Sequence, residues 1–445
     1  MKQISLWLFS AALILLSACS KERPDLSGLL KTVPSSAAAV AGIHLKSLYE
    51  DAGCKVNGNE IKPGKEISSI FEKMPETDKN EIMSLFRGDS GIVPDCAVAF
   101  LDANRSYITM SLYDSEKFKN FIKNETGNEF SSQGDGVEIC DNIAIKGAQV
   151  WISLKPKRID ADVISSFSTL SESQSFISTD MAKIILESDD DIIGWGKFNS
   201  LTSLLMNRKD MGMLSIASGL FFEDVDALTF SLDFEDGEME ASVKFLDEKG
   251  KPTKYLLPAD KIDINTVKSI EGTCDGLLAF TLTPKMIQKF EKIGSAIGGS
   301  LFNNFSESLK NIDGTVAFAL GEGGESMSGV VTTTGEVSRD INNLLSMGGI
   351  SFSQDGKILR LSRGTTMGGI SVDECADNLK GYCFGIVIDM NTLQKTAGSP
   401  SSFMTSLSNL TLGLEPKSGS IELKLNVKTV DPKENFLISL IKEIQ

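Results

Sequence analysis

The sequence has 445 residues, of which 60 are acidic and 44 are Lys or Arg, so its formal net charge is −16. This length provides for two or three domains with a sizeable core, and a hydrophobic share of 41% excludes a disordered chain. The negative charge argues against nucleic acid as a partner, because phosphates are neutralised by Lys and Arg.

The first segment in chain order, residues 1–18, has the layout of a leader peptide. Lys2 precedes an apolar stretch, Ile4 to Leu16, that is too short to span a bilayer. The stretch runs into Leu16-Ser17-Ala18-Cys19, which resembles the lipobox of bacterial lipoproteins. An ordinary signal peptide cleaved near Ala18 is the alternative. The lipobox implies that Cys19 carries acyl chains such as palmitate, and that residues 19–29 tether a soluble body to a membrane.

The residue after Cys19 indicates to which membrane a lipoprotein is sorted. Ser20 stands there instead of Asp, a pattern that in Gram-negative lipoproteins implies the outer membrane. The run from Ser20 to Asp25 mixes charges of both signs, unlike the acidic surface-export signal of Bacteroidetes lipoproteins. We therefore expect an outer-membrane, lipid-anchored protein, with the periplasmic and the cell-surface face both open.

The start of the mature chain, LLKTVPSSAAAVAGIHLKSLYEDAGC at 29–54, resembles a family of uncharacterised Bacteroidetes lipoproteins. That family is known only as a domain of unknown function. Its lipobox is followed by a proline, small residues, a strand and a helix that begins with Lys-Ser-Leu. The resemblance is strongest over 16–54 and implies a location and a lineage, with no catalytic motif to transfer.

The rest of the chain repeats itself. The stretch LTFSLDFEDGEMEASV at 228–243 recurs without a gap as LTLGLEPKSGSIELKL at 410–425, and both are typical of a β-hairpin. Residues 96–100 match 314–318, and each match leads into a strand, a short helix and an Asp-Gly turn. A strand that runs into a helix occurs at 39–53, 276–294 and 381–398, and more weakly at 191–205.

These repeats predict an α+β fold made by tandem duplication, in which each half is mainly antiparallel sheet with short interspersed helices. The expected boundaries are 30–250 for the first half, 251–272 for a linker and 273–445 for the second half. The longest helices are expected within 201–222 and 286–312.

Six cysteines follow Cys19, and an exported chain meets an oxidising compartment in which disulfides form. Cys375 and Cys383 are the nearest pair in sequence and are predicted as a possible disulfide. Small buried side chains are the alternative for all six. No Cys-x-x-Cys is present, so neither a zinc ribbon nor a thioredoxin-type site is supported.

No catalytic motif emerges from the sequence. Its single histidine, His44, lies in an apolar strand pattern and is expected to be structural or to face solvent, which argues against a Ser-His-Asp triad or a two-histidine metal site. The run 233–237 weakly resembles a calcium loop, but a hairpin turn is favoured. The run 189–191 is favoured as a solvated cap or turn. No metal, cofactor, catalytic or ligand-binding residue is therefore assigned.

The sequence thus predicts a non-enzymatic envelope lipoprotein that is held to the membrane by its lipid anchor and binds a protein partner or an apolar ligand. One alternative is a hydrolase of an envelope or dietary polymer that uses paired carboxylates, which 60 acidic residues allow. The other alternative is a surface adhesin or glycan-capture accessory, for which Trp151 or Trp195 would have to be exposed.

Overall fold

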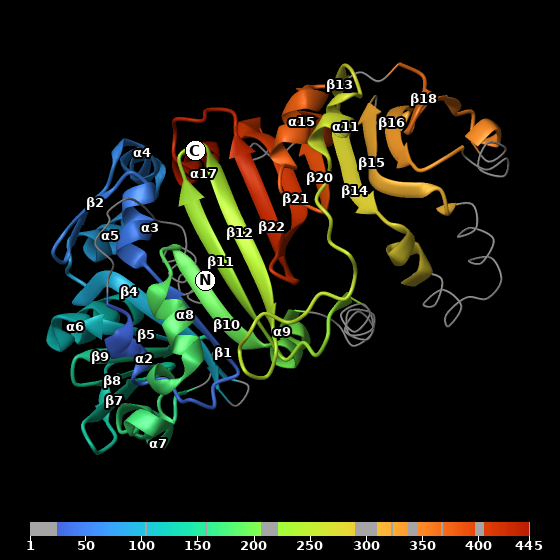
Figure 1. Ribbon diagram of the computed structural model, residues 1–445. Coiled ribbons are helices and arrows are strands. Elements are labelled where there is room, and N and C mark those ends of the chain that lie inside the picture. The colour runs from blue at the N-terminus through green and yellow to red at the C-terminus, as the bar shows by residue number, and fades with distance from the viewer. Residues whose placement is uncertain are drawn as a thin grey trace. The chain divides into compact units, whose positions relative to one another are not determined.

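The computed structural model describes residues 25–102, 105–155, 158–205, 221–289, 309–321, 324–336, 345–365, 368–396 and 405–444. The chain divides into two compact units (Figure 1). Unit 1 comprises Met1–Asn207, Asp226–Met239 and Asp431–Gln445, and unit 2 comprises Arg208–Val225 and Glu240–Val430. Residues 431–445 thus belong to unit 1, whereas the halves expected from the sequence place them in the second half.

Unit 1 is built on an antiparallel sheet whose central strand is β1 (Ala39–Ile43). β1 pairs with β4 (Ile92–Asp102) on one side and with β10 (Ile192–Lys197) on the other. Beyond β4 lie β5 (Arg105–Leu112) and β9 (Gln149–Ser153), and beyond β10 lies β11 (Ala227–Glu235). Smaller strands are β2 (Lys55–Asn57), β3 (Glu60–Lys62), β6 (Ser131–Ser132), β7 (Val137–Cys140) and β8 (Ile143–Lys146).

Helices cover both faces of this sheet because its strands are apolar on both sides. Ala97 of β4 packs into one core, whereas its neighbours Cys96 and Val98 pack into the other. The first core includes residues of α3 (Leu45–Asp51), α4 (Lys65–Lys73), α5 (Glu76–Phe86), α6 (Ser115–Thr126) and α17 (Phe436–Ile444). The second includes residues of α2 (Ser27–Leu30), α7 (Ala161–Ser168) and α8 (Asp180–Glu187). The short helix α9 (Phe198–Leu205) follows β10.

Local sequence explains where these helices begin. The side chain of Asp114 accepts a hydrogen bond from the backbone N–H of Lys117 at 3.0 Å and so caps α6. Phe118, Phe121 and Ile122 then fall on one face of the helix and are buried. The order of a cap followed by an apolar face therefore fixes both the start of α6 and the side that packs on the sheet.

In unit 2 the antiparallel strands are centred on β14 (Gly276–Leu282). β14 pairs with β15 (Ile312–Gly321) and with β20 (Phe384–Asp389). The sheet continues past β15 through β16 (Ser326–Thr333), β18 (Ile358–Arg363) and β17 (Ser351–Asp355). Past β20 it continues through β21 (Leu407–Lys417), β22 (Ser420–Thr429) and β12 (Glu238–Leu246).

One face of the unit 2 sheet is covered by α11 (Ile264–Lys268) and α15 (Val372–Asn378). β13 (Thr273–Cys274) and β19 (Ile370–Ser371) form a two-stranded ribbon, and β19 leads directly into α15. α16 (Met390–Thr396) follows β20. The segment 251–272, expected as a linker, belongs to unit 2, where Ile262, Val267 and Ile270 are buried in this core.

The predicted α+β class with mainly antiparallel sheet is confirmed, because every strand pair for which a register is defined in the described residues is antiparallel. The leader 1–18 and Cys19 lie outside the described residues, as do most of the helices expected within 201–222 and 286–312. Among the described residues, no helix is long and apolar enough to cross a membrane.

Candidate functional site

Three aspartates of unit 1 lie together, and we call Asp51, Asp191 and Asp233 the aspartate cluster. Asp51 is the last residue of α3, Asp191 directly precedes β10, and Asp233 is on β11. Only 4% of Asp51 and 2% of Asp191 is exposed to solvent. Carboxylates are rarely buried, because burial is costly unless hydrogen bonds or opposite charges compensate for it. The hydrogen bonds of these aspartates therefore indicate their role.

Those hydrogen bonds tie the aspartates to the surrounding elements. Asp191 accepts one from the Ser47 hydroxyl at 2.6 Å, through Oδ1, and one from the backbone N–H of Phe234 at 2.9 Å, through Oδ2. Asp51 Oδ1 accepts from Nδ2 of Asn435. The Oδ1 atom of Asn435 in turn accepts from the backbone N–H of Leu437 at 3.0 Å and caps α17. The cluster therefore joins α3, β10, β11 and α17.

Burial changes the protonation of these groups. It is the main cause that raises the pKa of Asp51 to about 9, and the negative charges of Asp191 and Asp233 add to it. Burial also raises the pKa of Asp233 and that of Asp191. A carboxyl group whose pKa is near 9 holds its proton at neutral pH, so Asp51 is a hydrogen-bond donor within the cluster.

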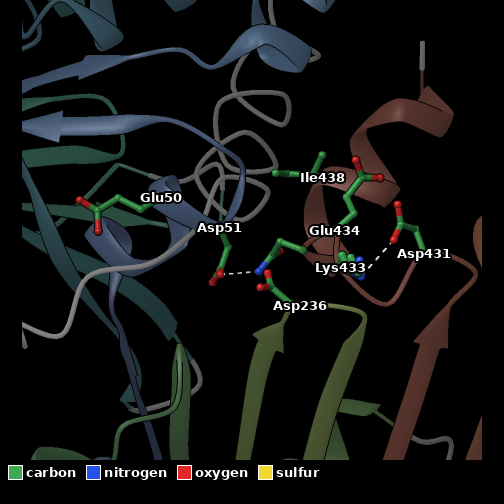
Figure 2. Close-up of a pocket in the computed structure, with 8 residues that line it drawn as sticks. Glu50, Asp51, Asp236, Asp431, Lys433, Glu434 and Ile438 are labelled. Carbon is green, nitrogen blue, oxygen red and sulfur yellow. Dashed lines mark hydrogen bonds between the residues drawn. The ribbon is translucent and has the colours of Figure 1, made fainter.

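Beside the cluster, the surface of unit 1 has an open hollow of about 420 Å³ (Figure 2). We call it the acidic hollow, because five of its eight lining residues are acidic. The lining residues are Glu50, Asp51, Asp236, Asp431, Lys433, Glu434, Asn435 and Ile438. Figure 2 shows Asp51 and Asp236 near each other, whereas the side chain of Glu50 turns away from them.

The floor of the hollow depends on a close backbone approach. Asp236 and Gly237 form the turn after β11, and Gly237 has a φ of +78°. Its N–H donates to the carbonyl of Glu434 at 2.8 Å. A Cβ at this position would lie 2.7 Å from the Cα of Pro432. Only glycine fits both the conformation and the space, so this turn positions Asp236 at the hollow.

Charges in the hollow are partly balanced. Glu434 forms an ion pair with Lys442 and accepts a hydrogen bond from the Ser439 hydroxyl at 3.0 Å. Asp431 accepts from the backbone N–H of Lys433 at 3.0 Å. Asp236 is exposed. The lining thus presents more negative than positive charge to a ligand from solvent.

The two acidic runs of the sequence analysis contribute to the cluster. Asp191 from the run 189–191 meets Asp233 from the run 233–237, although each run by itself was favoured as a turn or cap. Asp51 and Asn435 were not singled out, because their meeting joins residues 384 positions apart. Across the described ranges, no group of three or more His, Cys, Asp or Glu residues is arranged to hold a metal ion.

Other residues weighed in the sequence are in the interior. His44 is buried, and its Nδ1 lies 2.9 Å from the carbonyl oxygen of Asp190. Trp151 is fully buried, and Trp195 is half-buried against the ring of Phe176. These tryptophans do not form the exposed stacking surface that a glycan site needs.

The six cysteines of the described residues are all buried free thiols. Sγ of Cys375 lies 3.8 Å from Sγ of Cys274. The thiol of Cys383 donates to the carbonyl of Leu414 at 3.4 Å. The predicted bond between Cys375 and Cys383 is therefore absent from the structure, and the nearer neighbour of Cys375 is a cysteine that the sequence did not single out.

Comparison with known proteins gives no family. No family model and no curated protein matches the chain. Among solved structures, crystal form III of TP0453 is 10% identical, with a TM-score of 0.29, over 78% of this chain and 96% of that one. Crystal form I is 11% identical, with a TM-score of 0.27, over 78% and 95%. Scores this low carry no argument about fold or function.

Proposed function

We propose that this protein is a non-enzymatic, lipid-anchored protein of the outer membrane that binds a cationic segment of a protein partner. The acidic hollow of unit 1 is the observation that supports a cationic partner. Its walls place Asp236 and Asp431 beside a space of about 420 Å³, which can hold a few side chains of a peptide. Lys and Arg of a partner would find complementary charge there.

The lining also separates this proposal from the alternatives. Ile438 is the one aliphatic residue among those that line the hollow, which disfavours an apolar ligand. A carboxylate-dependent hydrolase needs two carboxyl groups that reach a substrate. Asp51 and Asp191 are buried instead, and their oxygens accept hydrogen bonds from Asn435, Ser47 and Phe234. These bonds suit a structural role.

A direct test of the hollow uses a synthetic peptide rich in Lys and Arg, titrated into the protein by calorimetry at low ionic strength. The double variant Asp236→Asn/Asp431→Asn removes two negative charges from the lining of the hollow. It is expected to weaken peptide binding about threefold to tenfold, since each exposed charge pair contributes up to about 1 kcal/mol. The matched control, Glu172→Gln, changes an exposed acid elsewhere in unit 1 and should leave affinity unchanged. Equal affinity for a Gln-substituted peptide would refute the cationic partner.

The anchor rests on Leu16-Ser17-Ala18-Cys19 and is tested separately. Cells fed radioactive palmitate should label the wild-type chain, and Cys19→Ala should abolish the label without changing the fold. Labelling that persists in Cys19→Ala would place the acyl chain elsewhere and remove the support for this anchor.

We also propose that the two halves of the chain, 30–250 and 273–445, arose by tandem duplication, as the sequence repeats predict. The support is a shared strand order. In unit 1 the order of neighbouring strands is β9-β5-β4-β1-β10-β11, and in unit 2 it is β18-β16-β15-β14-β20-β21. Each central strand comes first along the chain, and its neighbours follow in the same order.

The registers agree residue by residue. One row of partners across the unit 1 sheet is Val150, Met110, Ala97, Ile43, Ile192 and Leu232, and the matching row of unit 2 is Leu359, Val331, Val316, Phe280, Phe384 and Leu414. Leu232 and Leu414 are also equivalent in the gapless sequence match.

A shared irregularity strengthens this support. The ladder between β4 and β5 is irregular just before Ala97, and the ladder between β15 and β16 is irregular just before its counterpart, Val316. β-Bulges are specific features that relatives tend to share. By register, the counterpart of Ala97 is Val316. The sequence match of 96–100 with 314–318 aligns Ala97 with Thr315 instead, one residue earlier. A shift of one residue exchanges the two faces of a strand, so the register replaces the sequence match here.

A further inference from the structure

We propose that Cys274 and Cys375 form a disulfide bond when the chain is exported, a covalent modification that joins β13 to α15 in unit 2. The inference rests on the envelope location proposed above, because a disulfide persists only in an oxidising compartment. It differs from the bond expected from the sequence, between Cys375 and Cys383.

The two thiols are already neighbours. Their sulfur atoms lie 3.8 Å apart, and both side chains are fully buried in the core beneath α11 and α15. A disulfide has a sulfur–sulfur distance of about 2.05 Å, so the two atoms have to approach by a further ~1.8 Å. Small side-chain rotations can supply such a movement.

Local structure holds both cysteines in place. Cys274 on β13 pairs with Ile370 on β19, and β19 leads directly into α15. Ser371 caps α15 by accepting a hydrogen bond from the backbone N–H of Glu374 at 3.1 Å. The strand pairing and the cap therefore fix Cys375 relative to Cys274, across 101 positions in sequence.

Their hydrogen bond also makes the two thiols unequal. The hydrogen bond with Cys375 lowers the pKa of Cys274, whereas the pKa of Cys375 is raised by the same bond and by burial. In the folded protein Cys274 is therefore the more easily ionised of the two thiols, and the thiolate is the nucleophile in disulfide exchange.

The chemistry is an exchange with an external disulfide, either a small molecule or an oxidoreductase. One of the two cysteines, as its thiolate, attacks one sulfur of that disulfide, the external S–S bond breaks, and one thiol leaves. The other cysteine then loses its proton and attacks the protein sulfur of this mixed disulfide, which expels the second thiol. Two protein thiols are oxidised to one disulfide, and one external disulfide is reduced to two thiols.

Burial dictates when this exchange takes place. An oxidant cannot reach two fully buried sulfurs in the native state, so exchange has to precede closure of the core. The bond is therefore expected to form quickly during refolding and slowly in the native protein. Once formed, it restricts the unfolded chain over a loop of about 100 residues and stabilises unit 2.

The test begins with the full-length protein, unfolded and reduced, then refolded with oxidised and reduced glutathione. After thiols are blocked, trypsin separates the three candidates, since it cleaves after Lys268, Lys285, Arg363, Lys380 and Lys395. The expected product links peptide 269–285 to peptide 364–380. Peptide 381–395, which carries Cys383, should be recovered with a blocked thiol.

Stability gives a second readout. The oxidised protein should melt at least about 5 °C above the reduced one, and this gain should vanish in Cys274→Ala and in Cys375→Ala but persist in Cys140→Ala. In the wild-type protein, a link from Cys375 to Cys383, or three unlinked peptides after refolding, would overturn the inference. This outcome does not depend on whether the variants fold.

Cells test the location independently. In acid-quenched cells the free thiols are blocked, the protein is isolated, and the same tryptic peptides are mapped. Linked peptides support both the bond and the exported location. Free thiols in cells, together with a bond that forms on refolding, would overturn the exported location on which the inference rests, while leaving the pairing of the two cysteines intact.

Discussion

Asp51 shows how one residue can control the pH dependence of folding in unit 1. Its pKa is raised to about 9, mainly by burial, whereas its ordinary value is 3.8. The folded state therefore binds a proton that the unfolded state releases above about pH 4. The stabilisation is complete below pH 4 and is lost as the pH rises towards 9, with a slope of at most about 1.4 kcal/mol per pH unit for one proton.

The variant Asp51→Asn should flatten this dependence, because its amide carries no titrating proton and can still accept from Asn435. Urea unfolding between pH 5 and pH 8 measures the slope. Asp191 and Asp233 keep part of it, since burial raises their pKa values too. The exposed control Asp162→Asn should retain the wild-type slope. An unchanged slope in Asp51→Asn would show that Asp51 does not hold this proton.

Gly237 and Gly419 offer a matched pair at the residue scale. Both follow a strand of the repeated segment and have a positive φ, of +78° and +90°. A Cβ on Gly237 would meet the backbone of Pro432 at 2.7 Å, whereas a Cβ on Gly419 would meet nothing within 4 Å. Gly419→Ala should therefore cost only the conformational strain, about 1 kcal/mol, and Gly237→Ala at least about twice that. Equal costs in urea unfolding would contradict the close approach at Pro432.

At the scale of elements, an aspartate side chain lies at the start of the short helix that precedes the central strand of each unit. Asp25 accepts a hydrogen bond from the N–H of Ser27 at 2.8 Å at the start of α2. Asp263 accepts one from the N–H of Asn265 at 3.0 Å at the start of α11. Each short helix precedes the central strand of its unit, but Asp263 is the N-cap residue of α11, whereas Asp25 precedes Leu26, the N-cap residue of α2.

We expect Asp263→Ala to lower the free energy of unfolding by about 1 kcal/mol, the usual contribution of an N-cap, and Asp25→Ala to lower it by about 0.5 kcal/mol, because its hydrogen bond with Ser27 is exposed. Chemical denaturation measures the effect. Asp260→Ala, at an exposed position shortly before α11, is the control and should cost less than about 0.5 kcal/mol. A cost below about 0.5 kcal/mol for Asp263→Ala would contradict its role as the N-cap of α11.

At the scale of the whole molecule, charge and anchor act in opposite directions. The net charge of −16 makes a surface of anionic lipids repel the protein. Attachment by acyl chains on Cys19 would depend on hydrocarbon insertion, which salt does not screen. The wild-type protein should therefore stay with membranes in 1 M NaCl and leave them in detergent.

The same fractionation distinguishes the anchor from a binding surface. Cys19→Ala should appear in the soluble fraction at low salt, because the acidic body has no electrostatic attraction to the bilayer. Membrane-bound Cys19→Ala that is released by salt would instead indicate a charged docking surface, and would contradict attachment through lipid alone.

Local pattern alone determined much of this protein. Alternating apolar residues and turn residues predicted the antiparallel α+β class, because side-chain period and backbone geometry are properties of a few consecutive residues. The match of 228–243 with 410–425 identified two pairs of consecutive strands, β11 with β12 and β21 with β22. The acidic runs near Asp191 and Asp233 were visible as well, although their meeting was not.

Tertiary structure decided the rest. Asp51 meets Asn435, and Cys274 meets Cys375, across 384 and 101 positions, and no local pattern fixes such distances. The protonation of Asp51 follows from burial, which the folded neighbours create. Proximity in sequence suggested Cys383 as the partner of Cys375, but strand pairing placed Cys274 there. Such contacts depend on how elements pack, and packing is a property of the whole chain.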